Sequence, residues 1–285
     1  MTTRTFLITG VSSGLGRAFA EGALAAGHVV VGTVRKPDDL AAFEAIAPGR
    51  AHARQLDVTD DEAVFAVVAE VEQTVGPIDV LIANAGYGYE GVFEESPLAE
   101  LRAQFDANVF GTAATAQAVL PGMRKRRSGH IFAVGSMGGL MTVPGLSYYH
   151  GSKYALEGIF ETLAKEVASF GVRVTIIEPG SFRTNWSGSS MRRSSRSIPE
   201  YDELFDPIRA ARQAASGNQL GNPAKAADAV LAVIDAENPP VHLVLGSDAL
   251  RLVDAGRAAV NADIETWEQL SRSTDFPDGH QIVST

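Results

Sequence analysis

The chain has 285 residues, of which 34 are acidic and 24 basic, and it contains no cysteine. The net charge of −10 argues against nucleic acid and anionic membrane surfaces as partners, because both require a basic face. The lack of cysteine excludes a disulfide framework, a thiolate nucleophile and cysteine-ligated zinc. With 45% hydrophobic residues, the chain has ample material for a buried core.

No targeting signal is evident at the amino-terminal end. The apolar run of Phe6, Leu7 and Ile8 ends at Thr9, which is too short for the hydrophobic region of a signal peptide. No apolar run is long enough to span a membrane. We therefore expect a cytoplasmic protein with no membrane partner.

Taken in chain order, short runs of Val, Ile and Leu alternate with longer stretches of helical periodicity. Strands are predicted at 5–9, 28–34, 51–56, 78–83, 130–134, 172–177 and 241–245. Helices are predicted at 15–26, 38–46, 60–75, 98–123 (in one or two pieces), 148–170 and 223–236. The nearly continuous apolar strands are typical of a parallel sheet covered on both faces. The pattern predicts a single α/β domain over 1–285, with a doubly wound, mostly parallel seven-stranded sheet flanked by helices (Rossmann fold).

One segment interrupts the alternation. Residues 187–197 are polar, serine-rich and basic, and weak helical character follows up to residue 215. The segment leaves the carboxyl end of a strand, where open α/β sheets bind ligands. We therefore expect a substrate-binding loop or lid at about 186–215.

A glycine-rich turn joins the first strand to the first helix, with the sequence Thr9-Gly10-Val11-Ser12-Ser13-Gly14-Leu15-Gly16. Its glycines allow the backbone to approach a pyrophosphate, and the amides that open the helix face that anion. The spacing G-x-x-x-G-x-G differs from the general dinucleotide fingerprint. A simple tight turn is the alternative interpretation.

Three further loops follow predicted strands. After the second strand there is no acidic residue to bind a ribose 2′-hydroxyl, and Arg35 and Lys36 can bind a 2′-phosphate, which favours NADP(H) over NAD(H). A solvated basic pair is the alternative. Asp57, before Val58, can accept a hydrogen bond from adenine or serve as a helix cap. The small residues of Asn84-Ala85-Gly86 permit close approach of a cofactor, or form a simple turn.

Tyr149 and Lys153 are four residues apart and share one face of a predicted helix. A nearby ammonium favours phenolate, so we expect Lys153 to lower the pKa of Tyr149. The pair can then exchange a proton with a carbinol oxygen. On its own, such a spacing also fits an ordinary surface pair.

In this order the pieces resemble the short-chain dehydrogenase/reductase family. Residues 9–16 match its TGxxxGxG motif, 84–86 its NAG motif, and Tyr149 and Lys153 its YxxxK motif. Asn108 and Ser136 stand where the family has its helix asparagine and its serine, and Pro179, Gly180 and Thr184 match PGxxxT. The likeness covers about 4–185 firmly and continues weakly to about 250.

The resemblance implies roles. Tyr149 is the expected general acid and base, Lys153 lowers its pKa and binds the nicotinamide ribose, Ser136 binds the substrate oxygen, and Asn108 holds a water in a proton relay. These four are the expected catalytic residues. The expected cofactor-binding residues are Gly10, Ser12, Ser13, Gly14, Leu15, Gly16, Arg35, Asp57, Val58, Asn84, Ala85, Gly86, Asn108, Tyr149, Lys153, Pro179, Gly180, Phe182 and Thr184.

The expected function is an NADP(H)-dependent oxidoreductase acting on a carbonyl or secondary alcohol, with NAD(H) as a possible second cofactor. Two alternatives remain open: a non-catalytic NADP(H)-binding sensor, and an epimerase or dehydratase that uses the same four residues. The substrate is expected to be a fairly apolar small molecule. The six histidines show no metal spacing, so no metal site is expected. The family often forms dimers or tetramers through helices near 98–125 and 148–170.

Overall fold

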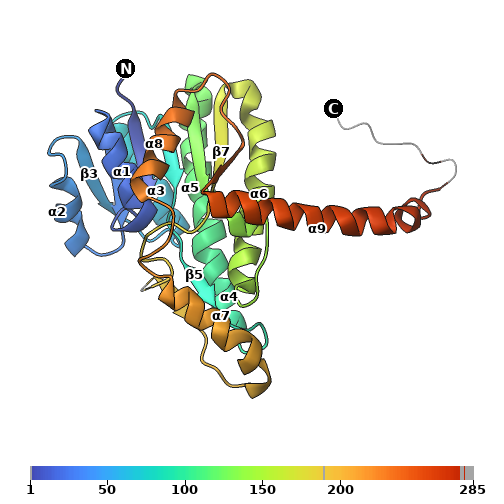
Figure 1. The fold of residues 1–285 in the computed structure, drawn as a ribbon. Coiled ribbons are helices and arrows are strands. Elements are labelled where there is room, and N and C mark those ends of the chain that lie inside the picture. The colour runs from blue at the N-terminus through green and yellow to red at the C-terminus, as the bar shows by residue number, and fades with distance from the viewer. Residues whose placement is uncertain (1, 189, 277–278, 280–285) are drawn as a thin grey trace.

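A seven-stranded parallel sheet organises the protein, with strand order β3-β2-β1-β4-β6-β7-β9 in a computed structural model (Figure 1). The structure describes residues 2–188, 190–276 and 279. Residues 1, 189, 277–278 and 280–285 of the predicted domain, and hence one position of the predicted lid, lie outside the described residues. The sequence therefore predicted the sheet and its fold class correctly.

The strands of the main sheet are β1 (Thr5–Thr9), β2 (Val29–Val34), β3 (Ala51–Gln55), β4 (Val80–Ala83), β6 (Gly129–Val134), β7 (Val172–Pro179) and β9 (His242–Leu245). A separate parallel pair consists of β5 (Gly88–Glu90) and β8 (Met191–Arg193). The α-helices are α1 (Gly14–Ala25), α2 (Asp38–Glu44), α3 (Asp61–Thr74), α4 (Leu98–Phe105), α5 (Gly111–Arg126), α6 (Ser147–Val167), α7 (Asp202–Ala214), α8 (Pro223–Ile234) and α9 (Ser247–Arg272).

Both faces of the sheet are buried. Successive side chains of a strand point to opposite faces, and accordingly Phe6 and Ile8 pack beneath α1 and α8 whereas Leu7 packs beneath α3, α5 and α6. Full burial of each such side chain contributes roughly 1.5–3 kcal/mol. This two-sided burial explains why the strands are apolar throughout rather than alternating.

The chain order of the strands creates a crevice. From β1 the chain adds β2 and β3 on one side and then returns to place β4 on the other side of β1. Such a reversal leaves a crevice at the carboxyl ends of the central strands, where open α/β sheets bind ligands. The glycine-rich turn after β1 and the Asn84 segment after β4 therefore meet there.

Helix boundaries follow local capping. Asp60 caps α3 by accepting a hydrogen bond from the Ala63 amide at 3.0 Å, and Asn222 caps α8 in the same way through the Ala224 amide. After α6, the chain turns into β7 at Gly171, which has a positive φ of 71°. Between α4 and α5, residues Asp106–Phe110 form a π-helical turn, η1, within the stretch predicted as one or two helices.

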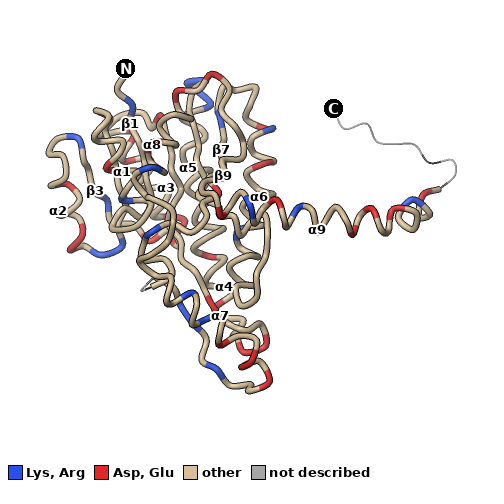
Figure 2. The backbone as a smooth tube through the Cα atoms, viewed as in Figure 1, with Lys and Arg blue, Asp and Glu red and all other residues tan. Residues whose placement is uncertain are grey.

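Three elements were not predicted from the sequence. They are the β5–β8 pair and α9, which projects away from the body in Figure 1 and exposes apolar side chains along its length. The weakly helical part of the predicted lid is more regular than expected, since it contains α7. Acidic and basic residues both gather around α7 (Figure 2). Among the described residues, no helix combines the length and hydropathy needed to cross a membrane.

Candidate active site

The glycine-rich turn is fixed by backbone and side-chain hydrogen bonds. The amides of Gly10 and Val11 donate to the Thr33 carbonyl of β2 at 3.1 and 3.0 Å. Gly10 and Gly14 have positive φ angles of 73° and 65°, which L side chains rarely adopt. The turn therefore requires glycine for its shape at these two positions.

Asn84 connects this turn to β4. Its side-chain amide donates to the carbonyls of Thr9 and Gly10 at 2.9 and 3.1 Å, and its backbone amide donates to Thr9 Oγ1. A Cβ on Gly16 would overlap both the Asn84 side-chain amide and the Gly10 carbonyl. The glycines and Asn84, which the sequence indicated as two separate motifs, thus form one tightly packed unit.

The amino-terminal end of α1 is open to an anion. Its N-cap residue, Ser13, makes no side-chain capping hydrogen bond, and the first turn carries no acidic residue. The first amides of a helix need partners and carry partial positive charge. Thr184, after β7, faces Gly14, with 3.8 Å between the Thr184 Cβ and the position of a Cβ added to Gly14.

Other expected cofactor residues lie at the carboxyl ends of the strands, and some of them are exposed whereas others are buried. Arg35 is exposed immediately after β2. Asp57 is also exposed, and its Oδ1 accepts hydrogen bonds from the Thr59 amide and hydroxyl at 3.1 and 2.9 Å, while Asp60 rather than Asp57 caps α3. Val58 is buried against α5, and Phe182 packs against Gly221.

Tyr149 and Lys153 are buried on α6. The Lys153 ammonium donates to the Val134 carbonyl at 2.8 Å and lies 5.7 Å from the centroid of the Tyr149 ring. Burial lowers the pKa of Lys153 to about 8, and the nearby Glu157 carboxylate opposes this shift. Burial also raises the pKa of the Glu157 carboxyl, to which the neighbouring Glu178 carboxylate adds.

The expected lowering of the Tyr149 pKa by Lys153 is wrong. Burial raises the pKa of Tyr149 to about 12, and its hydrogen bond with Ser136 lowers the pKa only in part. The Lys153 ammonium faces the ring and is bound to a carbonyl. It therefore stabilises the phenolate form of Tyr149 less than burial destabilises that form. Tyr149 is therefore a neutral phenol at physiological pH.

Ser136 begins the loop after β6, and His150 holds that loop in place. Ser136 Oγ accepts a hydrogen bond from the Gly138 amide at 3.0 Å. His150 Nε2 accepts from the Val143 amide at 3.0 Å, so its Nδ1 carries the proton and donates to the Gly138 carbonyl at 2.8 Å. Burial lowers the pKa of His150, which keeps this tautomer neutral. Sequence reasoning missed His150, because a lone histidine carries no signal.

Asn108 lies in the π-helical turn η1 and joins three segments. Its Oδ1 accepts from the Tyr87 amide at 3.0 Å, and its Nδ2 donates to the Tyr87 carbonyl at 3.0 Å and to Ser152 Oγ at 3.1 Å. Ser152 in turn donates to the Tyr149 carbonyl at 2.7 Å. Through Ser152, Asn108 thus fixes the part of α6 that carries Tyr149 and Lys153. No sequence motif indicated Ser152.

The turn at Pro179 and Gly180 is held by both β9 and α9. The Gly180 amide donates to the Leu245 carbonyl at 2.8 Å, and Asp248 accepts from the Ser181 amide at 2.8 Å. A Cβ on Gly180 would overlap the Asp248 carboxylate. Asp248 is a second structural contributor that the sequence did not indicate, because it lies in the helix that was missed.

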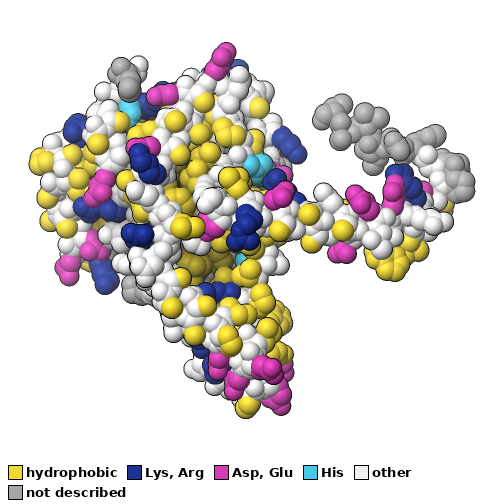
Figure 3. Space-filling view, in the orientation of Figure 1, with side chains coloured by type: hydrophobic (Ala, Val, Ile, Leu, Met, Phe, Trp, Pro, Cys, Tyr) yellow, Lys and Arg dark blue, Asp and Glu magenta, His cyan; other side chains and the backbone are white. Residues whose placement is uncertain are grey.

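Apolar side chains cover Tyr149. Leu146 and Met191 pack against it together with Val143 and Trp186, whose ring centroid lies 4.9 Å from that of Tyr149. Met191 belongs to β8 and was not among the expected site residues. The space-filling view shows hydrophobic side chains around a hollow between the sheet body and α7 (Figure 3).

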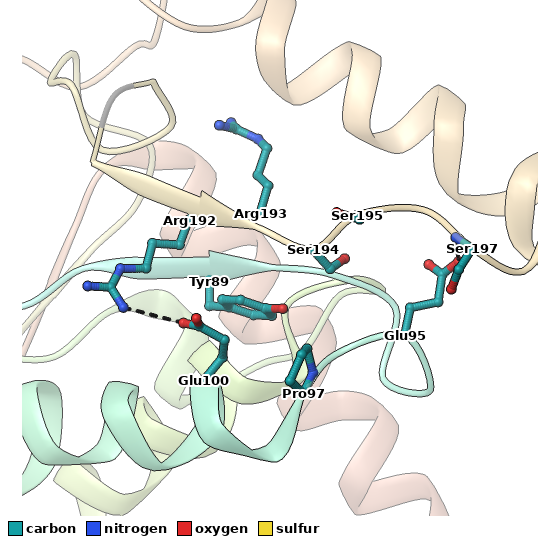
Figure 4. A pocket seen from close by; sticks show the side chains of 9 residues that line it. All are labelled: Tyr89, Glu95, Pro97, Glu100, Arg192, Arg193, Ser194, Ser195 and Ser197. Carbon is teal, nitrogen blue, oxygen red and sulfur yellow. Dashed lines mark hydrogen bonds and ion pairs between the residues drawn. The ribbon is translucent and has the colours of Figure 1, made fainter.

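A cavity of about 540 Å³ lies beside this cluster, lined by Tyr89, Glu95, Pro97, Glu100, Arg192, Arg193, Ser194, Ser195 and Ser197 (Figure 4). Met191 packs on Tyr149, whereas the next two residues of β8 line the cavity. Tyr89 stacks on Tyr148, with ring centroids 5.5 Å apart. Charged and hydroxyl side chains therefore make up most of the lining, and Tyr149 is not among the lining residues.

Comparison with known proteins agrees with this geometry. A family model described as short chain dehydrogenase matches residues 4–194. The solved structure of a short-chain dehydrogenase from Streptomyces avermitilis is 43% identical, with a TM-score of 0.90, and the match covers 96% of this chain and 100% of that chain.

Two curated relatives match over most of their lengths. Oxidoreductase BOA17 of Botryotinia fuckeliana is 39% identical over 270 residues, 94% of this chain and 98% of that protein. The 3-ketodihydrosphingosine reductase of Bacteroides thetaiotaomicron is 34% identical over 248 residues, 86% of this chain and 89% of that protein.

Proposed function

Because the chain belongs to the short-chain dehydrogenase/reductase family of oxidoreductases, we propose that it transfers hydride between NADP(H) and a carbonyl or secondary alcohol. The observation that carries the proposal is the buried group of Ser136, Tyr149 and Lys153 at the cofactor crevice. A buried phenol with a hydroxyl partner and a buried ammonium on the same helix face is suited to proton exchange with an alkoxide.

In the reductive direction Tyr149 donates its proton to the oxygen of the substrate carbonyl. Its neutral state, with a pKa of about 12, is the state that this step requires. The Ser136 hydroxyl donates a hydrogen bond to the same oxygen as negative charge develops. Lys153 supplies positive charge near this oxygen. Asn108 positions α6 and takes part in a relay that carries protons to solvent. NADPH, when bound, supplies the hydride.

The crevice fits a phosphorylated dinucleotide. The uncapped start of α1 offers amides to the pyrophosphate. The glycines support this placement through the shape of the turn, because Gly10 and Gly14 have positive φ angles and Gly16 packs against Asn84 and the Gly10 carbonyl. Exposed Arg35 stands after β2, where the 2′-phosphate of NADP(H) would lie, with Lys36 beside it. Asp57, Ala85 and Gly86 line the remaining part of the proposed cofactor site, and Lys153 holds the ribose.

Replacing Arg35 by alanine tests the cofactor preference. A hydrogen bond to a charged group contributes about 1.5–3 kcal/mol, so the R35A variant should bind NADPH roughly ten- to a hundredfold more weakly while NADH binding is unchanged. Arg124 is the charge-matched control, because it lies at the carboxyl-terminal end of α5, near the amino ends of the strands and away from the crevice. Equal losses for both cofactors, or a wild type that prefers NADH, would contradict the assignment.

We propose an apolar carbonyl compound as substrate. Val143, Leu146, Trp186 and Met191 surround Tyr149, and a site of this kind binds apolar groups around few polar ones. The relative from B. thetaiotaomicron, whose name specifies 3-ketodihydrosphingosine, is consistent with a ketone that carries an apolar chain.

Residues 186–215 act in this proposal as a lid that opens to admit the substrate. Buried Glu90 holds the lid: Arg209 and Arg193 approach its Oε1 at 2.9 and 3.4 Å, and Arg212 approaches its Oε2 at 3.5 Å. Arg196 adds an ion pair to Glu95 at 2.8 Å. Three guanidinium groups thus depend on one carboxylate that has no exposed surface.

We expect the E90Q substitution to loosen the lid. Removing one partner of a buried charge cluster costs about 3 kcal/mol or more, so hydrogen exchange in β8 and α7 should accelerate about a hundredfold or more. The control is E100Q, which breaks the exposed pair between Arg192 and Glu100 at 3.4 Å and should change little. Equal exchange in the two variants would refute the role of Glu90.

An absorbance screen at the nicotinamide band tests the function as a whole. Purified protein with NADPH is offered ketones, aldehydes and sugars, and we expect net NADPH consumption with apolar ketones. A sensor would bind NADPH without consuming it. An epimerase or dehydratase would change its substrate without net consumption. Binding without consumption across the panel would contradict the proposal.

The protein is further proposed to work in the cytoplasm as a homodimer or homotetramer. Apolar side chains on α4 and its neighbours support an interface, since Phe110 is 58% exposed and joins Leu101 and Phe105 around a second hollow. On α6, Tyr154 and Ile159 are also exposed. Exposed apolar surface of this kind marks association sites.

A further inference from the structure

Outside the proposed active site, three ionisable side chains from distant parts of the chain converge. They are Glu157 of α6, Glu178 of β7 and His242 of β9, and one ligand atom of each lies within 4.8 Å of the others. His242 Nδ1 is 2.6 Å from Glu178 Oε1 and 3.6 Å from Glu157 Oε2. Two oxygen atoms and one nitrogen therefore surround a common point.

The two carboxylates are deeply buried and poorly paired. Glu157 is 4% exposed and Glu178 is fully buried. Among the described residues, neither oxygen of Glu157 nor Oε2 of Glu178 has a hydrogen-bond donor. Buried carboxylates are costly unless a cation, several donors or a retained proton compensates them, and burial raises the pKa of both groups. The unpartnered oxygen atoms are thus available to a positive ligand that takes the place of such a proton.

The nearest cations do not compensate the pair directly. Lys153 is occupied by the Val134 carbonyl, and Arg257 of α9 acts on Glu178 only at long range. Within the described part of the chain, no lysine or arginine forms an ion pair with Glu157 or Glu178, and the imidazole of His242 contacts both carboxyl groups. The two carboxyl groups therefore have no lysine or arginine partner among these residues to balance them when they are ionised.

His242 is oriented as a metal-binding histidine is. Its Nδ1 faces the two buried carboxylates, whereas its Nε2 faces Glu161 Oε1 at 3.5 Å. Metal-ligating histidines usually direct their second ring nitrogen to a carboxylate or carbonyl, which fixes the tautomer. Glu161 is thus placed as a positioning residue one turn beyond Glu157 on α6.

We propose that Glu157, Glu178 and His242 bind one divalent transition-metal ion of the zinc class. Bonds of about 2.0–2.2 Å in tetrahedral geometry separate ligand atoms by roughly 3.4 Å. The separation of 3.6 Å between His242 Nδ1 and Glu157 Oε2 is close to that value. The 2.6 Å contact between His242 Nδ1 and Glu178 Oε1 is a hydrogen bond, which the ion would replace as the two atoms move apart. Two carboxylates and a neutral imidazole neutralise a dication. The partly exposed His242 gives the ion access from solvent.

The ion would have a structural consequence for the active site. It would fasten α6, which carries Tyr149 and Lys153, to the end of β7, where Glu178 directly precedes Pro179 and Gly180. It takes no part in hydride or proton transfer. The sequence predicted no metal site, because the three ligands come from separate elements and have no characteristic spacing.

Calorimetric titration tests the site independently of enzyme activity. Protein treated with a chelator and dialysed is titrated with zinc chloride, and we expect one ion per chain. The H242Q variant should bind at least a hundredfold more weakly. The H52Q variant, which changes a histidine of β3 at the other edge of the sheet, should bind like the wild type. Cobalt(II) gives a second readout, through the intense visible absorption of four-coordinate complexes.

The E161Q variant provides a second test in case H242Q does not fold. Glu161 is 42% exposed, so its replacement should not disturb the core. Loss of an outer partner of a ligating histidine typically weakens metal binding about ten- to a hundredfold. Absence of stoichiometric zinc binding to the wild type, or equal affinity in H242Q, E161Q and H52Q, would overturn the proposal.

Discussion

Replacing Tyr149 by phenylalanine should abolish turnover while NADPH still binds. The phenol oxygen is the only atom removed, and a general acid or base typically contributes about 10²–10⁴-fold to the rate. Because the ring remains, its packing against Leu146, Met191 and Trp186 is retained. The measurement is the rate of NADPH consumption with a substrate from the screen, together with a fluorescence titration of NADPH.

The neighbouring tyrosine provides the matched control. Tyr148 is as buried as Tyr149, but its hydroxyl donates to the Ser96 carbonyl at 2.6 Å and lies away from Lys153. The Y148F variant should therefore keep most of the wild-type rate and lose only some stability. Wild-type turnover in Y149F, or equal losses in the two variants, would rule out Tyr149 as the acid and base.

The second large effect is expected from the G16A substitution. The added methyl group would overlap the Asn84 side-chain amide and the Gly10 carbonyl, and one of these is backbone that cannot rotate away. The turn must therefore shift. Overpacking of this kind costs roughly 1–3 kcal/mol of stability. A displacement of about 1 Å in a binding turn lowers catalytic efficiency about a hundredfold, and NADPH affinity should fall with it.

Gly158 offers the matched control for this substitution. It lies on α6, and a Cβ added there meets no atom within 4 Å. Alanine is favoured over glycine inside a helix by about 1 kcal/mol, so G158A should be at least as stable as the wild type and bind NADPH normally. Thermal unfolding and NADPH titration of both variants distinguish the outcomes. Normal NADPH binding by G16A would show that the turn is not the pyrophosphate site.

The main sheet could be predicted because each strand is covered on both faces. Burial of Phe6 and Ile8 on one side and of Leu7 on the other leaves a local apolar run that needs no knowledge of distant contacts. The glycine turn was equally visible, since backbone conformation and close packing at Gly10 and Gly16 restrict the residue type itself.

The β5–β8 pair and the lid contacts were missed because they depend on tertiary contacts, whereas α9 is a largely isolated helix. The β5–β8 pair has three residues per strand and joins segments about 100 residues apart in sequence, so it has no local signal. Helix α9 is amphipathic and long, yet its exposed Ile264 and Trp267 do not pack on the described body. The polar stretch of the lid gave no hint that its arginines gather around Glu90.

Electrostatics within the site could not be deduced from residue types alone. A lysine four residues after a tyrosine suggested a lowered pKa for Tyr149, but burial raises that pKa and the Ser136 hydrogen bond only partly opposes the increase. The contributions of Ser152, His150 and Asp248 depend on hydrogen bonds that the fold creates. The candidate reacting residues could therefore be proposed from motifs, whereas their protonation and their supporting hydrogen bonds depend on the fold.

Hydride transfer itself is the central claim and can be measured directly. NADPH that carries deuterium at its transferable position is incubated with the protein and an apolar ketone, and the alcohol product is analysed by mass spectrometry and NMR. We predict alcohol with one deuterium on the carbinol carbon from the wild type, and very little alcohol of any kind from Y149F in the same time. Product without deuterium, or no alcohol from any carbonyl compound that the protein binds, would contradict the assignment as an NADPH-dependent reductase.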